Sequence, residues 1–193
     1  MTTLDLSPVA LEADRRRLLA MLTERSYAKK KVILSSGRES DFYIDCKKTV
    51  LSAEGHWLTG KLMYAGARAQ FPDAVGVGGL TMGADPIASA IATVSFLGPV
   101  PLQAFLVRKE PKGHGTGQWI EGLTSLPKGA KVVIVEDVVT TGASTIKAIE
   151  RARAEGLEPV GAFTVVDRQE GGREAIEATG VKVVSLFARS DFP

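Results

Sequence analysis

The sequence predicts an α/β protein whose central sheet is mostly parallel and is covered by helices on both faces. From about residue 74 onwards, short apolar runs alternate with helical patterns. Polar residues do not alternate within the apolar runs, which is typical of strands buried on both faces. The 193 residues, 45% of them hydrophobic and 24% charged, suit one domain with a substantial core.

The first 50 residues do not share this alternation and are expected to form a small hood over one end of the sheet. A Ser-Pro pair at residues 7–8 favours a helix start, and that helix should end near residues 25–26. Residues 29–48 then indicate two short strands around a polar turn. We therefore expect one domain with a hood of about residues 1–50 and an α/β core of about residues 51–193.

The core is predicted to begin with a helix at residues 53–70. The apolar strands that follow are expected at residues 74–79, 101–107, 131–136, 159–167 and 181–187. Helices are expected between them at residues 85–97, 143–156 and 172–180.

Composition and charge argue against several classes of protein. The net charge of +2 is too small for binding by bulk charge, so we expect no nucleic-acid partner. The one cysteine, Cys46, forms no internal disulfide and fits a cytoplasmic location, and we expect no secretory signal. Residues 86–107 are uncharged and long enough to cross a bilayer. Because Gly98, Pro99 and Pro101 interrupt them, we expect a helix, a turn and a strand rather than a membrane span.

Polar or glycine-rich segments follow four of the predicted strands. They are the glycine run at 78–83, the basic segment at 108–118, the acid pair at 136–137, and Asp167 with Arg168. Ligands of open parallel sheets bind beyond the carboxyl ends of the strands. We therefore expect one site at this edge of the sheet.

The stretch VVIVEDVVTTGAST at residues 132–145 carries the first functional signal. An apolar strand delivers Glu136 and Asp137 at its end, and small hydroxyl-bearing residues lead into a helix. A helix N-terminus has free backbone N–H groups and a positive dipole end, so this turn predicts a phosphate cradle. Because the carboxylates would repel that phosphate, we expect them to accept hydrogen bonds from a sugar diol or to help hold a metal ion. The alternative is a capped helix with two exposed carboxylates; neither a GxxxxGK[ST] nor a GxGxxG motif is present here.

The segment LVRKEPKGHGTGQWIEG at residues 106–122 carries the second signal. Arg108, Lys109, Lys112 and His114 gather positive charge beside three alternating glycines. Because a cluster of one sign repels itself unless an anion binds, we interpret the segment as a mobile lid over a polyphosphate rather than as a solvated loop.

These motifs resemble those of one enzyme family. VVIVEDVVTTGAST is similar to the 5-phosphoribosyl pyrophosphate (PRPP) signature of type I phosphoribosyltransferases. The basic segment resembles the RKxxKxHGxxxxIEG pattern of orotate phosphoribosyltransferases. SSGRESDFYID (35–45) and VVDRQEGG (165–172) resemble that family's SGRxSxxYxx(D/N) turn and VxRQxGG motif.

The resemblance implies the type I phosphoribosyltransferase fold and a reaction. PRPP and orotate would give orotidine 5'-monophosphate and pyrophosphate in pyrimidine synthesis, with Mg²⁺ as cofactor. It also implies a homodimer in which the loop at 108–118 crosses to the partner's site.

The resemblance further assigns roles by position. The implied catalytic residues are Lys109, Lys112, His114 and Asp137. The implied PRPP contacts are Arg108, Lys109, Lys112, His114, Glu136, Asp137, Val138, Val139, Thr140, Thr141, Gly142, Ala143 and Ser144. The implied orotate contacts are Thr140, Arg168, Tyr43 and Ile44. No direct protein ligand to the metal is expected; PRPP would carry Mg²⁺, and Asp85 would join it through water.

The chain departs from the family pattern at three positions. Ser35 and Gly83 stand where many relatives have lysine, and Asp41 stands where proline is common. Two alternatives stay open, a phosphoribosyltransferase for another base and a PRPP-responsive regulator of the same fold. Arg168 favours orotate, because a guanidinium can grip a carboxylate through two parallel bonds.

Overall fold

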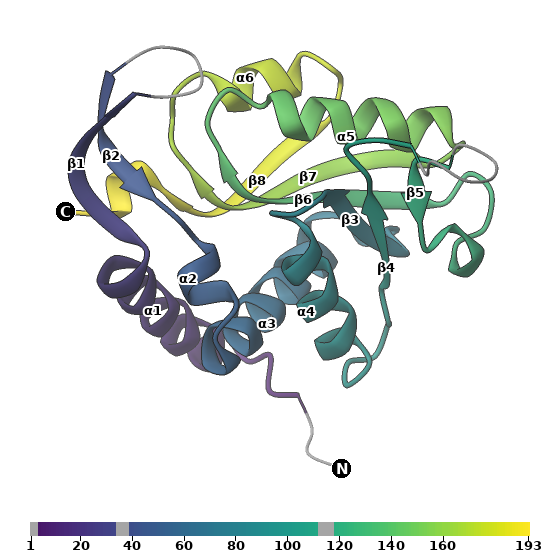
Figure 1. The fold of residues 1–193 in the computed structure, drawn as a ribbon. Helices are drawn as coiled ribbons and strands as arrows, with labels where there is room; N and C mark the ends of the chain where they lie inside the picture. Colours follow the sequence, from purple (N-terminus) through teal and green to yellow (C-terminus); the bar gives the residue numbers. More distant parts are fainter. Residues whose placement is uncertain (1–3, 34–38, 112–117) are drawn as a thin grey trace.

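A twisted six-stranded sheet forms the centre of the molecule, with helices on both faces and a separate hairpin at one end (Figure 1). The computed structural model describes residues 4–33, 39–111 and 118–193. The strands of the large sheet are β3 (Gly76–Leu80), β4 (Gln103–Val107), β5 (Ile120–Glu121), β6 (Lys131–Val139), β7 (Glu158–Asp167) and β8 (Lys182–Ala188). Their order is β5-β4-β3-β6-β7-β8, and each neighbouring pair is parallel except β4 and β5. The mostly parallel sheet predicted from the sequence is confirmed.

The helices form two layers, which Figure 1 shows below and above the sheet. The lower layer holds α1 (Pro8–Arg25), α2 (Lys47–Val50), α3 (Ala53–Gln70) and α4 (Asp85–Ser95), and the upper layer holds α5 (Ala143–Ala154) and α6 (Gly172–Glu177). Strand β6 shows why the apolar runs lack alternation. Val133 and Val135 pack in one core cluster with α3 and α4, whereas Val132 and Ile134 pack in another with α5 and α6. Both faces of the strand are therefore buried.

The N-terminal segment folds as the sequence predicts, with a helix followed by a two-stranded antiparallel sheet. Ser7 caps α1, because its hydroxyl accepts a hydrogen bond from the Ala10 N–H at 3.4 Å. Strands β1 (Tyr27–Ile33) and β2 (Glu39–Ile44) form the hairpin. Rings of Tyr27, Phe42 and Phe192 pack with centroids 5.2–5.6 Å apart and join the hairpin to the chain's C-terminal end.

Two local features differ from the expectations. Strand β6 continues through the acid pair to Val139, because Val138 and Val139 pair with β7. The short elements α2 and β5, and two single-turn 3₁₀ segments at Leu123–Ser125 and Arg189–Asp191, carry too few residues to give a periodic pattern. Residues 86–107 form a helix, a turn and a strand as predicted, and none of the described helices is both long and apolar enough to cross a membrane.

Candidate active site

The carboxyl ends of β3, β4, β6 and β7 bring the predicted segments to one edge of the sheet. Val139 of β6 pairs with Asp167 of β7, so the residues that follow them, Thr140 and Arg168, are neighbours. The Arg168 N–H donates to the Val139 carbonyl at 3.0 Å, which fixes this junction. The register of two strands thus joins the proposed phosphate end of the site to the proposed acceptor end.

The acid pair lies within strand β6, which continues for two residues beyond Asp137. Glu136 is 7% exposed, and its Oε2 is buried without a hydrogen-bond partner among the described residues. Burial, followed by the neighbouring charge of Asp137, raises the pKa of Glu136 well above its ordinary value. The Asp137 Oδ1 accepts a hydrogen bond from the Val138 N–H at 2.9 Å. The pair therefore offers one buried and one partly exposed carboxyl group to a ligand that brings hydroxyl donors.

The turn after β6 leads directly into a helix start, at the place where the sequence predicts a phosphate cradle. Gly142 has φ 80°, a left-handed conformation that glycine adopts without strain, and α5 begins at the next residue. No side chain of residues 4–33, 39–111 or 118–193 caps this helix start, and Ala143 and Ser144 are exposed. A cavity of about 170 Å³ lies here, lined by Glu136 and residues 138–145. Eight of the nine PRPP contacts predicted between residues 136 and 144 therefore line one cavity beside open backbone donors.

A second cavity of about 310 Å³ adjoins the acid pair. Its lining comes from five segments of the chain: Lys47, residues 80–83, Lys109, the acid pair and Ser144. A Cβ atom at Gly83 would lie 2.7 Å from Asp137 Oδ1 and 3.0 Å from Glu136 Oε1, so a larger residue would displace the acids. A cis peptide bond joins Thr81 and Met82 in the same loop.

The described part of the basic segment is held from two sides. Arg108 pairs with Glu121 of β5 at 3.1 Å, and Lys109 lines the second cavity. Arg151 of α5 donates to the carbonyls of Arg108 and Lys109, and its guanidinium lies 3.9 Å from the centre of the Trp119 ring. Arg151 therefore ties the helix of the phosphate cradle to both ends of the loop. The other two predicted contacts, Lys112 and His114, lie outside the described residues.

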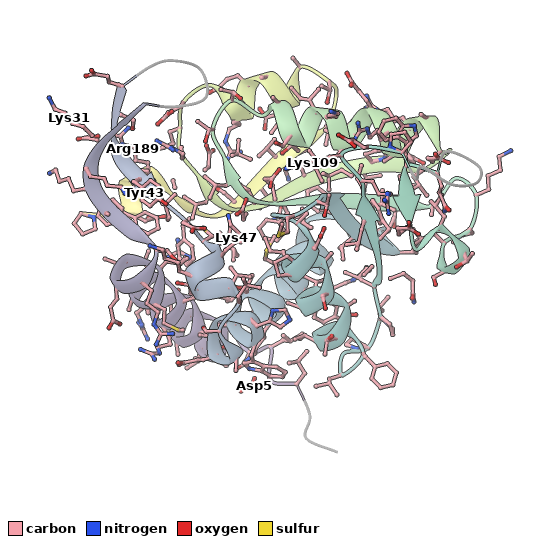
Figure 2. The ribbon with its side chains drawn as sticks, viewed as in Figure 1. Asp5, Lys31, Tyr43, Lys47, Lys109 and Arg189 are labelled. Atoms are coloured by element: carbon pink, nitrogen blue, oxygen red, sulfur yellow. The ribbon has the colours of Figure 1, made fainter. Side chains whose placement is uncertain are left out.

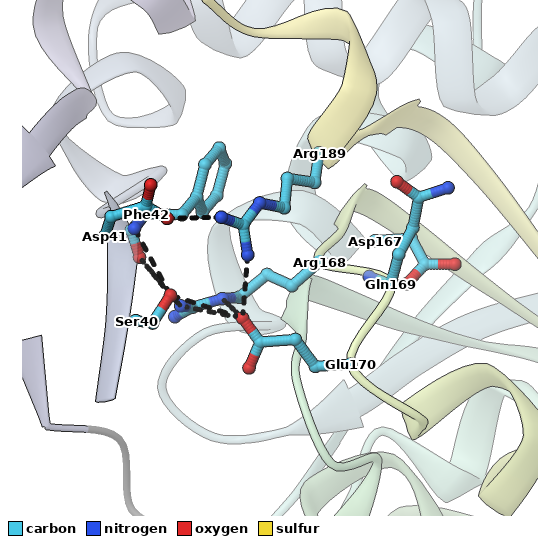
Figure 3. Close-up of polar contacts among 8 residues, drawn as sticks. All are labelled: Ser40, Asp41, Phe42, Asp167, Arg168, Gln169, Glu170 and Arg189. Atoms are coloured by element: carbon cyan, nitrogen blue, oxygen red, sulfur yellow. Dashed lines mark hydrogen bonds and ion pairs between the residues drawn. The ribbon is translucent and has the colours of Figure 1, made fainter. Parts of the chain in front are cut away.

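Arg168 lies at the acceptor end and is almost fully buried. Its Nη2 donates to the Ser40 hydroxyl at 3.0 Å and to the Phe42 carbonyl at 2.7 Å, both on the hairpin. Figure 3 shows Glu170 beside the same guanidinium, with Oε1 3.1 Å from Nη2. Arg189 approaches Glu170 at 3.7 Å and also pairs with Asp41. The hairpin and the core are thus joined by a charged network around Arg168.

The two predicted hairpin contacts differ in placement. Ile44 is 8% exposed and belongs to the core cluster, and the aromatic ring of Phe42, two residues earlier, is buried there as well. Tyr43 is half-buried instead, and the Lys30 ammonium lies 3.9 Å from its ring centre. Successive side chains of a strand point to opposite faces, so Tyr43 lies on the other face of the hairpin from Ile44.

A model of the phosphoribosyl transferase domain family matches residues 74–187. A protein named orotate phosphoribosyltransferase from Sorangium cellulosum is 51% identical over 93% of this chain and 93% of its own length. One of the same name from Aquifex aeolicus is 49% identical over 94% of this chain and 98% of its own. The chain belongs to the orotate phosphoribosyltransferase family. It is an enzyme of that family, as the motifs imply.

Solved structures of this family share the fold. The orotate phosphoribosyltransferase of Mycobacterium tuberculosis, in complex with PRPP, is 39% identical and has a TM-score of 0.75. The match covers 92% of this chain and 98% of the other. The type I phosphoribosyltransferase fold expected from the resemblance is confirmed.

The described residues do not form a metal site from protein side chains alone. Among them, no group of three or more His, Cys, Asp or Glu side chains is placed to hold an ion. Asp85 begins α4 and accepts a hydrogen bond from the Thr81 hydroxyl at 2.5 Å, while its Oδ1 is buried and has no hydrogen-bond partner in the described part of the chain. Its oxygen fits the preference of Mg²⁺ for hard ligands, but one carboxylate would have to act together with ligand oxygens.

Several residues of the site were not predicted from the sequence. They are Lys47, Ser40, Glu170, Arg189 and Arg151. Ser40 and Glu170 lie within the two motifs SSGRESDFYID and VVDRQEGG, so those motifs could have drawn attention to them. Lys47 had no such signal beyond following the first motif by two residues; it is the first residue of α2 and is labelled in Figure 2.

Proposed function

We propose that this chain transfers the phosphoribosyl group of PRPP to orotate, giving orotidine 5'-monophosphate and pyrophosphate. The observation that carries the proposal is the cavity at the β6–α5 turn, which is lined by Glu136 of the acid pair at its strand end. If the phosphate of a sugar phosphate bound at the start of α5, the sugar attached to it would lie beside the acid pair. The reaction breaks the bond from the anomeric carbon to a pyrophosphate oxygen and forms a bond from that carbon to a ring nitrogen of orotate.

The ribose 5-phosphate would be bound by the β6–α5 segment. Backbone N–H groups at the start of α5 and the hydroxyls of Thr140, Thr141 and Ser144 would donate to the phosphate. Glu136 and Asp137 would accept from the two ribose hydroxyls. A diol donates two hydrogen bonds, so it satisfies the buried Glu136 Oε2 that has no partner in the described protein.

The departing pyrophosphate gains negative charge as its bond to the sugar breaks. Lys109 lines the cavity beside the acids, where its ammonium would stabilise that charge. Arg108, Lys112 and His114 are assigned to the same task by the family resemblance, and His114 would be placed to supply a proton. Arg108 would give up its ion pair with Glu121 and bind the pyrophosphate instead. That ion pair is exposed to water and therefore weak.

Orotate would bind at Arg168, one strand away from the cradle. The guanidinium would hold the orotate carboxylate, with Thr140 between the two halves of the site. Ile44 and Tyr43 belong to the hairpin that borders Arg168, and we retain them as predicted ring contacts. Because Arg168 is bonded to Ser40, Phe42 and Glu170, orotate would have to replace part of this network.

Mg²⁺ would be held mainly by oxygens of PRPP, with Asp85 reaching it through water. The ion supplies positive charge to the pyrophosphate oxygens when it is bound. The protein's own contribution is to bind the two ends of PRPP and to exclude water between the hairpin and the sheet.

We also propose a cytoplasmic homodimer in which the loop at 108–118 reaches the partner's site. The family resemblance supports the dimer, and the single buried cysteine agrees with a reducing compartment. Light scattering of the purified chain tests the dimer: a monomeric mass would contradict it.

The activity is tested by the loss of orotate absorbance when PRPP and Mg²⁺ are added. Uracil, adenine, guanine and hypoxanthine with PRPP form the control panel, read as pyrophosphate release. We expect turnover with orotate alone. Turnover with a different base would show that orotate is not the acceptor. PRPP binding without turnover of any base would favour a PRPP-responsive regulator of the same fold.

A further inference from the structure

The cavity beside the acid pair has a cationic side chain that the motifs do not assign. Lys47 lines this cavity together with Gly83, Lys109 and Asp137. Its Nζ lies 3.0 Å from Asp45 Oδ1 and 3.5 Å from Asp137 Oδ2. Lys47 is the first residue of α2, and Figure 2 shows it between the hairpin and the sheet.

The backbone that carries Lys47 is firmly anchored. Cys46, Thr49 and Val50 of the same turn are buried. The Thr49 hydroxyl lies 2.8 Å from the Ser26 hydroxyl and donates to the Met21 carbonyl, which joins α2 to α1. The ammonium therefore extends from a rigid base toward the cavity.

The side chain of Lys47 is nevertheless free to exchange its partners. It is 44% exposed, whereas Asp137 is 15% exposed. Ion pairs of exposed ammonium groups are weak, so an incoming anion can take the place of a carboxylate. Partial burial lowers the pKa of Lys47, but the hydrogen bond to Asp45 and the charge of Asp137 outweigh it and raise the pKa overall. The group stays charged at neutral pH.

The carboxylate of Asp137 has Gly83 on one side and Lys47 on the other. A Cβ atom at Gly83 would meet Asp137 Oδ1 at 2.7 Å, while the Lys47 ammonium approaches Oδ2. A side chain at position 83 would push the carboxylates of the acid pair out of their present positions, and glycine supplies no charge there. Lys47 reaches the same cavity from the hairpin side without disturbing the acids.

We propose that Lys47 is a catalytic residue that binds the pyrophosphate group of PRPP from the α2 side of this cavity. The inference rests on the proposed function, since it names a residue for the pyrophosphate part of that site. With Lys109 it would hold the leaving group between two ammonium ions, one from the α2 turn and one from the loop after β4. The Asp137 carboxylate that Lys47 releases is then available to the ribose.

Calorimetry with two ligands tests this role. Lys47→Met should weaken binding of inorganic pyrophosphate with Mg²⁺ by about tenfold or more, the value of one hydrogen bond between charged groups. Binding of ribose 5-phosphate should stay within about twofold. Lys47→Arg should recover much of the pyrophosphate affinity. The matched control is Lys48→Met, which removes the same charge from an exposed neighbour that lines neither cavity at the acid pair.

The enzyme assay adds a second readout. Lys47→Met should lower kcat/KM for PRPP at saturating orotate by at least the same factor, with the KM for orotate unchanged. Unchanged pyrophosphate affinity in a folded Lys47→Met protein would overturn the proposal, as would a loss confined to ribose 5-phosphate. If the unmodified chain bound pyrophosphate through Lys47 yet converted no base, the proposed function would fail while this site would stand.

Discussion

The two ends of the proposed site are built in different ways. At the phosphate end, the β6–α5 turn presents backbone N–H groups with no side-chain cap, next to a cavity. At the acceptor end, Arg168 is already bonded to Ser40, Phe42 and Glu170 (Figure 3). The first end is preorganised by local backbone geometry, whereas the second has to exchange protein contacts for ligand contacts. Changes at the two ends should therefore affect different substrates and different kinetic constants.

The largest effect is expected at Arg168. Arg168→Ala removes both parallel bonds to the acceptor carboxylate, so kcat/KM for orotate should fall by about a hundredfold or more, while PRPP binding is retained. The control is Arg189→Ala, which loses the contacts with Glu170 and Asp41 but not the proposed orotate contact. Initial rates at varied orotate measure both. An equal loss in the two variants would mean that Arg168 acts only by holding the hairpin in place.

At the phosphate end, Gly142→Ala should weaken ligand binding by about tenfold. Residue 142 has φ 80°, and an added Cβ would lie 2.8 Å from the Gly172 carbonyl oxygen, so the turn has to shift. We expect weaker binding of PRPP and of ribose 5-phosphate by calorimetry, with orotate binding unchanged. Gly156→Ala is the control, because it shares a left-handed φ of 79° and has open space around the added atom. If both variants bound PRPP like the parent chain, the cradle would be in the wrong place.

Glu136→Gln should separate stability from ligand binding. Burial and the charge of Asp137 raise the pKa of Glu136 in the folded protein. The folded chain therefore holds this proton more tightly than the unfolded chain, and the resulting stability is present below about pH 4 and is lost as the pH rises. Glutamine does not titrate, so the variant should gain thermal stability relative to the parent chain as the pH rises above about pH 4.

The same Glu136→Gln protein should bind PRPP about fivefold more weakly, because a neutral amide is a poorer acceptor for a ribose hydroxyl than a carboxylate. Melting curves across the pH range and a PRPP titration give the two values. A stability difference that did not change with pH would show that Glu136 is ionised throughout.

The smallest effect is expected from Glu170→Gln. Glu170 lies 3.1 Å from the Arg168 guanidinium, where the orotate carboxylate is proposed to bind. Removing its charge should lower the KM for orotate by about threefold, because a neutral amide competes less well for the guanidinium. The KM for PRPP serves as the internal reference. A higher KM for orotate would show that Glu170 orients Arg168 instead of competing for it.

Much of the phosphate end could be predicted because its parts are contiguous in the chain. An apolar strand, two acids, a glycine and a helix start form the whole unit from residue 132 to residue 145, and local conformation decides its shape. The position of the acids was less predictable. They lie inside β6, because the pairing with β7 extends the strand beyond the apolar run.

The acceptor end was only partly predictable, because its contacts span distant parts of the chain. The sequence pointed to Arg168 as a carboxylate ligand but not to its buried bonds with Ser40 and Phe42, which are 128 and 126 residues away. Lys47 is separated from Asp137 by 90 residues, and no motif joins them. Such contacts depend on how the hairpin docks on the sheet.

The sequence by itself determined the order of strands and helices along the chain and the strand–turn–helix unit at the end of β6. Hydrophobic periodicity and turn chemistry act over a few neighbouring residues, so both can be predicted locally. Only the tertiary structure decided which charges meet across the site. The packing of β1, β2 and α2 against the sheet places Ser40 beside Arg168 and Lys47 beside Asp137. These contacts join residues far apart in the chain, so no local sequence pattern predicts them.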